Sequence, residues 1–99
     1  MIKISISKEV GSFAENKDVA GKLRNEFIIP AIERGEHVEI DFSDVDLATQ
    51  SFIHALIAEA LRRCGEDSLQ LLMFKSCSDS IRGIIETVVQ YVLETMDEG

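Results

Sequence analysis

The sequence predicts a single α/β domain in which strands and helices alternate along the chain. Three short segments, 2–7, 37–42 and 69–74, have the alternation or the apolar composition of strands. A helical segment follows each one, so the expected order is β-α-β-α-β-α, which is typical of parallel strands joined by right-handed crossovers. A chain of 99 residues can bury one hydrophobic core but not two, so one domain covers residues 1–99.

The first strand is predicted from isoleucines at positions 2, 4 and 6, which alternate with polar residues. Residues 9–16 form a connector, and Asn16 is the expected N-cap of a helix over 17–34. The apolar residues of this helix recur at helical spacing: Val19, Leu23, Phe27 and Ile28. Pro30 interrupts the pattern, so we expect a kink or two short helices that meet near Ile29.

The second strand, 37–42, has Val38 and Ile40 on one side and polar residues on the other. A helix over 49–64 follows, and Gly65 is the expected glycine at its end. The third strand spans 69–74. Its helix begins after the N-cap Ser78 and carries a stripe of five apolar residues: Ile81, Ile84, Ile85, Val88 and Val92. The last residues, 94–99, are acidic and are predicted to be frayed.

Two of the three strands have one apolar and one polar side, whereas a parallel sheet covered on both faces has continuous apolar runs. We therefore predict that all three helices lie on one face of the sheet. This requires each strand to be added beside the previous one, as in a stepwise β-α superhelix. Leu72 and Phe74 are then expected to look out from the open face.

Composition excludes several classes of function. The formal charge is −8, with 18 acidic and 10 basic residues, which argues against binding to nucleic acid or to anionic membranes. No apolar run reaches the ~20 residues of a membrane-spanning helix, and the N-terminus lacks the features of a signal peptide, so we expect a cytoplasmic protein. The two cysteines have no metal-binding spacing, and no cofactor is expected.

The best candidate for a functional site is the link between the second strand and the second helix. In α/β folds the strand's carboxyl end and the helix's amino end meet there, and exposed N–H groups collect at this junction. The polar residues of the link and the first helical turns are the predicted partner-binding residues: Asp44, Asp46, Thr49, Gln50, Ser51 and His54.

Val38 to Leu56, VEIDFSDVDLATQSFIHAL, resembles the signature of STAS domains, the fold of anti-sigma-factor antagonists. The pattern is an apolar strand, an Asp, and then a small polar cluster at the start of a helix. A closer resemblance is to the STAS-like family of unknown function. It rests on these residues: Asp41, Phe42, Val45, Thr49, Ser51, Phe52, Leu72, Met73 and Phe74. The resemblance implies a regulatory domain whose partner is a histidine-kinase-type ATPase.

The chain departs from the phosphorylatable antagonists at the cluster itself. Gln50 stands at the position of the regulatory serine, and Phe52 stands at that of a glycine. Thr49 and Ser51 are the neighbouring hydroxyls that could accept a phosphate instead. The alternative is that one of them only caps the helix, which is the more common role of Ser and Thr at that position.

Catalytic and metal sites find little support in the sequence. Asp41, Asp44 and Asp46 do not have the spacing of a calcium loop. His54 lies one turn from Ser51, but no third residue is available to orient it as a base. The glycines are scattered and form no phosphate-binding loop. We expect a protein that is not an enzyme.

Three functions remain as hypotheses. The leading one is a regulatory module that binds a protein partner through residues 42–52 and the helix that follows, with phosphorylation as an optional switch. The second is a structural subunit that forms a homodimer through Leu72, Phe74 and the sheet edge. The third is a binder of a small anion or nucleotide at the start of the second helix.

Overall fold

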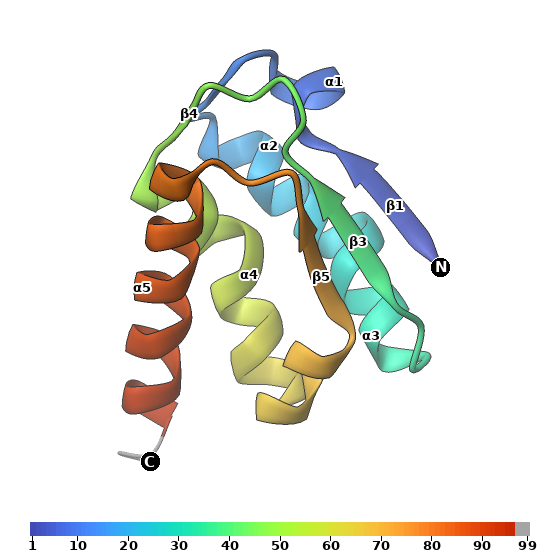
Figure 1. The fold of residues 1–99 in the computed structure, drawn as a ribbon. Coiled ribbons are helices and arrows are strands. Elements are labelled where there is room, and N and C mark those ends of the chain that lie inside the picture. Colours follow the sequence, from blue (N-terminus) through green and yellow to red (C-terminus); the bar gives the residue numbers. More distant parts are fainter. Residues whose placement is uncertain (97–99) are drawn as a thin grey trace.

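Three parallel strands form the main sheet of the structure, a computed structural model that describes residues 1–96. The strands are β1 (Ile2–Ser5), β3 (Val38–Asp41) and β5 (Leu72–Lys75), and they lie in the order β1-β3-β5 (Figure 1). Both pairs are parallel, so each strand is added beside the previous one. The predicted stepwise β-α superhelix is confirmed.

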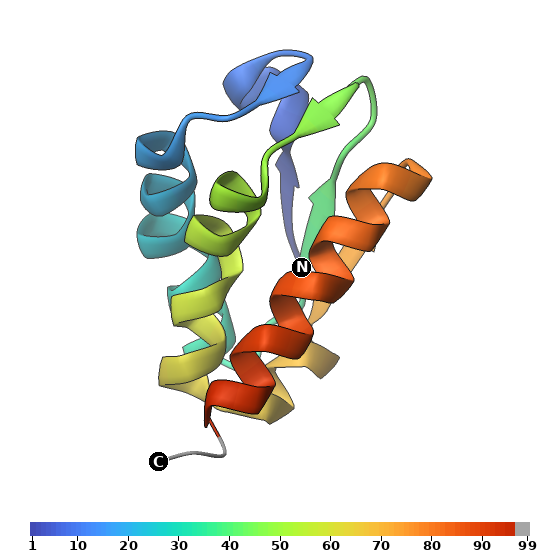
Figure 2. The ribbon, with the colours of Figure 1, turned by 90° about the vertical axis from the view of Figure 1, so that its left-hand side faces the viewer.

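The helical segments that follow the three strands leave one face of this sheet open. They are α2 (Lys17–Leu23), the π-helical turn η1 (Arg24–Ile28), α3 (Ile29–Glu33), α4 (Gln50–Cys64) and α5 (Asp79–Met96). In Figure 1 the α2, α3 and α4 helices lie behind the strands, and α5 lies beside α4 at the β5 edge. Figure 2 shows the same helices from the side. Within residues 1–96, the front of the sheet carries no helix, as the one-sided strands predict.

The α4 helix is the centre of the core. It packs against α5, against α2 and η1, and against α3. Seven of its side chains are buried: Phe52, Ile53, Leu56, Ile57, Ala58, Ala60 and Leu61. Burying a large aliphatic side chain stabilises a fold by about 1.5–3 kcal/mol, so this helix is the largest apolar contribution of any single element.

The predicted helix ends agree with the structure. The side chain of Asn16 accepts hydrogen bonds from the N–H groups of Asp18 and Val19, at 2.9 and 3.3 Å. The Ser78 hydroxyl accepts from the N–H of Ile81 at 3.2 Å. Gly65 ends α4 with a φ of 90°, a conformation that side chains disfavour and glycine adopts freely.

Pro30 divides the predicted helix over 17–34, as expected, but it does so through a π-helical turn. Proline has no N–H to donate to the carbonyl of Glu26. In the turn before it, the N–H of Ile29 donates to Arg24, five residues back, instead of four. The extra residue shifts the helix phase, so Ile28 is buried and Phe27 is 43% exposed. The helical spacing grouped Phe27 with Leu23 and Ile28, but the structure does not bury it with them.

The first strand is shorter than predicted, because the chain turns into helix α1 (Ile6–Val10) after Ser5. The expected connector at 9–16 contains a further strand, β2 (Phe13–Ala14). It pairs in parallel with β4 (Leu47–Ala48) in a small second sheet. Both strands have two residues, which is too short for a pattern of alternation to reveal them.

The third strand begins later than predicted, after a 3₁₀ turn, η2 (Glu66–Gln70). Its register pairs Val38 with Leu72 and Ile40 with Phe74. Paired residues of parallel strands share a face. Leu72 and Phe74 therefore point to the helix side, and the prediction that they look out from the open face is wrong. A homodimer through these two residues loses its proposed contacts.

The predicted frayed tail is wrong for residues 94–96, because α5 continues to Met96. Residues 97–99 of that predicted tail lie outside the described residues. Of the helices in residues 1–96, none is both long and apolar enough to cross a membrane.

The core position of α4 predicts unequal effects of two truncations. Ile57→Ala removes a fully buried side chain and is expected to lower the free energy of unfolding by about 2–5 kcal/mol. Leu47→Ala, at a side chain that is 52% exposed, is expected to lower it by about 0.5 kcal/mol or less. Urea denaturation followed by circular dichroism measures both. Equal losses would contradict the assignment of α4 to the core.

Candidate functional site

The link from β3 to α4 begins with a turn closed by Asp41. Its Oδ1 accepts hydrogen bonds from the N–H and the hydroxyl of Ser43, at 2.9 and 2.7 Å. These two bonds favour the charged carboxylate, and they hold the pKa of Asp41 below its ordinary value. Asp44 then adopts a left-handed conformation, with a φ of 65°, which turns the chain towards the second sheet.

Backbone hydrogen bonds attach the rest of the link to residues 12–14. The N–H of Asp46 donates to the carbonyl of Ser12 at 2.8 Å, and that of Thr49 donates to Ala14 at 2.9 Å. Val45, a residue of the link, is itself buried. The small sheet therefore holds the link in a single path over the carboxyl ends of β1 and β3, at the top of Figure 1.

The two candidate hydroxyls have different environments. Thr49 is the N-cap of α4, and its Oγ1 accepts from the N–H of Phe52 at 3.1 Å. Ser51 is exposed and forms no side-chain hydrogen bond with the described residues. Of the two roles that the sequence left open, capping belongs to Thr49. Ser51 is the hydroxyl that a second protein can reach.

Three of the predicted residues lie together around a shallow hollow at the start of α4. Gln50, Ser51 and His54 line it, and Lys17 from the first turn of α2 completes it. His54 also lies beside Tyr91 of α5, with ring centroids 6.4 Å apart. No hydrogen bond joins His54 to Ser51 among the described residues, so this geometry does not provide a base for the serine hydroxyl.

Asp44 and Asp46 do not line this hollow. Both are exposed on the link. Within the part of the chain that the structure describes, no group of three or more carboxylate, histidine or cysteine side chains is placed to hold a metal ion. What the two aspartates supply is negative charge beside the site.

The structure adds an apolar feature that sequence reasoning missed. Phe13 of β2 and Leu47 of β4 are paired in register, and they are 46% and 52% exposed. Their neighbours Ala14 and Ala48 are buried, so the small sheet directs its two large side chains outward. The sequence offered one signal of this feature, a large apolar residue within each of two polar connectors. That Phe13 and Leu47 are adjacent follows only from the pairing of these two distant segments in the folded chain.

The comparison with known protein families matches residues 19–82 to the STAS-like domain of unknown function (DUF4325). The chain belongs to this family. The matched region of this STAS-like domain runs from α2 to the first turn of α5, and it includes the whole link and α4. Comparisons with curated proteins and with solved structures gave no match.

Removing the cap of α4 is expected to destabilise the STAS-like domain. Thr49→Ala deletes the acceptor for the N–H of Phe52 and is expected to lower the free energy of unfolding by about 1 kcal/mol. Thr49→Ser keeps the oxygen and serves as the control. Ser51→Ala, which removes no such bond, is expected to have little effect in the same urea titration. A larger loss at Ser51 than at Thr49 would contradict the assignment of the cap.

The Asp41 turn predicts a measurable change of pKa. Ser43→Ala removes the hydroxyl that donates at 2.7 Å, so the pKa of Asp41 is expected to rise towards its ordinary value. Because the folded pKa is lowered, the turn contributes stability above the unfolded pKa and loses it as the pH falls through the folded pKa. Carbon-13 NMR titration of the Asp41 carboxyl measures the shift. An unchanged midpoint in the variant would show that the hydroxyl does not cause it.

Proposed function

We propose that this STAS-like domain is a non-catalytic regulatory module that binds a protein partner through the β3–α4 link and the first turn of α4. The observation that carries the proposal is the exposed pair of Phe13 and Leu47 beside these polar groups. Covering such side chains removes apolar area from water, which favours association. Central apolar anchors of this kind supply much of the affinity of protein interfaces.

The charge around the pair specifies the chemistry of the partner. Residues 13–18 and 44–47, which contain the pair, carry four exposed carboxylates, from Glu15, Asp18, Asp44 and Asp46, and one exposed lysine, Lys17. A complementary surface has an apolar centre within a basic rim, because opposite charges at the rim raise the association rate and exclude acidic competitors. We take a histidine-kinase-type ATPase with such a surface as the first partner to test, on the strength of the STAS resemblance.

Phosphorylation of Ser51 is the regulation that we propose for this surface. A phosphate there would lie at the amino end of a 15-residue helix, where N–H groups and the helix dipole favour negative charge. Lys17 lines the same hollow and would neutralise part of the added charge. Thr49 is a poorer acceptor, because its oxygen already caps the helix.

A partner bound at this surface is expected to be sensitive to Leu47 and Phe13. A photo-crosslinking residue at position 47 of the whole chain should capture the ATPase, while the same residue at position 27 should not. Leu47→Ala and Phe13→Ala are each expected to weaken its affinity about tenfold, as anchor truncations do, in isothermal titration calorimetry. Phe27→Ala is the matched control, since Phe27 is similarly exposed but lies on another surface. An equal loss at Phe27, or none at Leu47, would refute the proposed surface.

The proposed switch has its own test. Against a partner with a basic rim, Ser51→Asp adds a favourable charge pair and is expected to raise the affinity by about two- to fivefold. Ser51→Asn, similar in size and uncharged, is the control. If phosphorylated Ser51 and Ser51→Asp both bind with the affinity of the unmodified chain, Ser51 is not part of the interface.

A further inference from the structure

The exposed pair of Phe13 and Leu47 has a geometry that specifies what kind of segment it can bind. The two residues are paired in register on parallel strands, which lie side by side at the top of Figure 2. Neighbouring strands are about 4.8 Å apart, so the pair forms one short apolar ridge. Side chains at i and i+3 or i+4 of a helix are about 5–6 Å apart, whereas alternate side chains of an extended peptide are about 7 Å apart. The ridge therefore matches the side-chain spacing of a helix.

An added strand is a poorer occupant of the small sheet. β2 and β4 have two residues each. The edge of such a strand offers only about one or two main-chain hydrogen bonds to a peptide. Main-chain bonds supply the affinity when a peptide extends a sheet. The outward face of the ridge, and not the edge of the sheet, is therefore the surface available for docking.

Carboxylates lie beyond both ends of the ridge. Asp44 and Asp46 precede it on the link to β4. Glu15 and Asp18 follow it at the other end, because β2 is parallel to β4. The N–H of Asp46 donates to the carbonyl of Ser12 at 2.8 Å, so these two residues are neighbours. At a rise of about 3.3 Å per residue, Asp46 and Glu15 are thus about 10 Å apart along the strands, the length of about two helical turns.

The cations near the ridge do not balance these four carboxylates. Lys17 is the single cation of residues 12–18 and 43–49, and it also lines the hollow at Ser51. α1 packs beside β2, and the start of α5 packs beside β4. Each of these two helices adds one charge of each sign: Lys8 and Glu9 from α1, Asp79 and Arg82 from α5. The ridge therefore lies in a negative local potential.

We propose that the segment of the partner that binds this surface is a basic amphipathic helix. The inference rests on the proposed function and specifies its ligand. Aliphatic side chains at i, i+3 and i+4 of the helix pack around Phe13 and Leu47. Lysines or arginines about one turn beyond them, at each end, face the two groups of carboxylates. The apolar stripe supplies affinity, and the two basic ends set the register of the helix on the ridge.

Other occupants fit the same observations less well. A second copy of the chain, docked through the same patch, would place identical carboxylates on both sides of the contact, and like charges repel. The carboxylates also repel the phosphates of nucleic acid and of anionic lipid. An acidic peptide meets the same repulsion. A basic helix is the occupant that satisfies both the apolar spacing and the charge.

The test uses a capped peptide of about 18 residues, long enough to be partly helical in isolation, with the full-length chain. Leucines stand at i, i+3, i+4 and i+7, arginines stand one turn beyond them at both ends, and alanine fills the remaining positions. Isothermal titration calorimetry at 0.15 M salt is expected to detect binding. NMR is expected to show shifts of the Phe13 ring and the Leu47 methyl signals.

Three control peptides separate a docked helix from general attraction between opposite charges. The first has the same composition but leucines spread around the helix, so it keeps the charge and loses the apolar stripe. The second has a central proline, which breaks the helix. Both are expected to bind at least about tenfold more weakly. The third has glutamate in place of arginine and is expected not to bind. Binding of any of the three with unchanged affinity would overturn the proposal.

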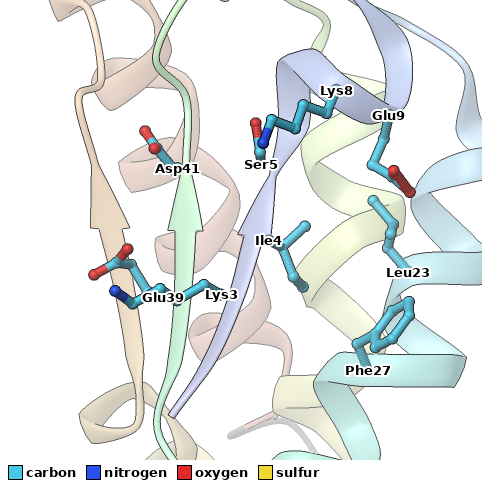
Figure 3. Close-up of a pocket in the computed structure, with 9 residues that line it drawn as sticks. All are labelled: Lys3, Ile4, Ser5, Lys8, Glu9, Leu23, Phe27, Glu39 and Asp41. Atoms are coloured by element: carbon cyan, nitrogen blue, oxygen red, sulfur yellow. The ribbon is translucent and has the colours of Figure 1, made fainter.

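Variants of the chain locate the helix. Asp46→Lys and Glu15→Lys are each expected to weaken binding about three- to tenfold, because each opposes one basic end of the peptide. Glu86→Lys, the same change of charge at an exposed residue of α5, is the control. Phe27→Ala is the apolar control, because Phe27 lines a hollow at the β1 edge that carries lysines and carboxylates together (Figure 3). Circular dichroism and thermal unfolding establish that each variant is folded.

The remaining outcomes also decide the question, and they separate this proposal from the proposed function. Capture of the ATPase at position 47 without binding of the peptide at millimolar concentration would keep the surface and refute the helix. Binding of the peptide without capture of the ATPase would keep the helix and refute that partner. NMR shifts confined to Phe27 or Tyr91 would move the peptide to another surface and overturn the proposal. Self-association that sedimentation detects and that Asp46→Lys changes would replace the helix with a second copy.

Discussion

The burial of α4 is the constraint on which the rest of this STAS-like domain depends. This helix packs against α5 on one side and α2 on the other, and seven of its fifteen side chains are buried. These contacts fix the direction in which its first turn points. The N-terminus must emerge at the carboxyl ends of β1 and β3, where the Thr49 cap and the backbone bonds to residues 12–14 hold it.

Much of this arrangement follows from sequence pattern alone. The alternation at positions 2–5 and 38–41 identifies strands with one apolar face, and the helices lie on that face as expected. The caps at Asn16, Ser78 and Gly65 were also predictable, because a cap depends on a few adjacent residues. Features whose cause lies within about one helical turn are therefore readable in one sequence.

Features that depend on distant segments were not predictable in this way. The β2–β4 pair consists of two-residue strands, and only the folded chain brings Phe13 beside Leu47. The face of the sheet on which Leu72 lies depends on the residue at which the 3₁₀ turn ends and β5 begins. A shift of one residue would move every side chain of the strand to the other face. For the same reason the site predicted on the link did not include the apolar pair that lies beside it.

The π-helical turn shows how one residue alters two surfaces. Pro30 has no N–H to donate, and the turn before it is a wider, π-helical turn. The side chains before this turn are therefore rotated about the helix axis relative to those after it. Ile28 consequently fills the core position that Phe27 would occupy in a regular helix. The guanidinium of Arg24, within the same turn, donates to the carbonyl of Ala55 at 2.9 Å, so the widened turn is attached to α4.

The position of α5 after the third strand of the main sheet has a consequence for biosynthesis. The stepwise order of strands lets β1, β3 and the helices between them assemble while the ribosome still holds the remainder. The flank of α4 that contacts α5 stays uncovered during that interval, because Ile81, Ile85, Val88 and Val92 are translated after α4. A nascent chain of this domain thus passes through a stage with an uncovered aliphatic surface, and the time until α5 emerges from the ribosome determines how long chaperones can recognise that surface.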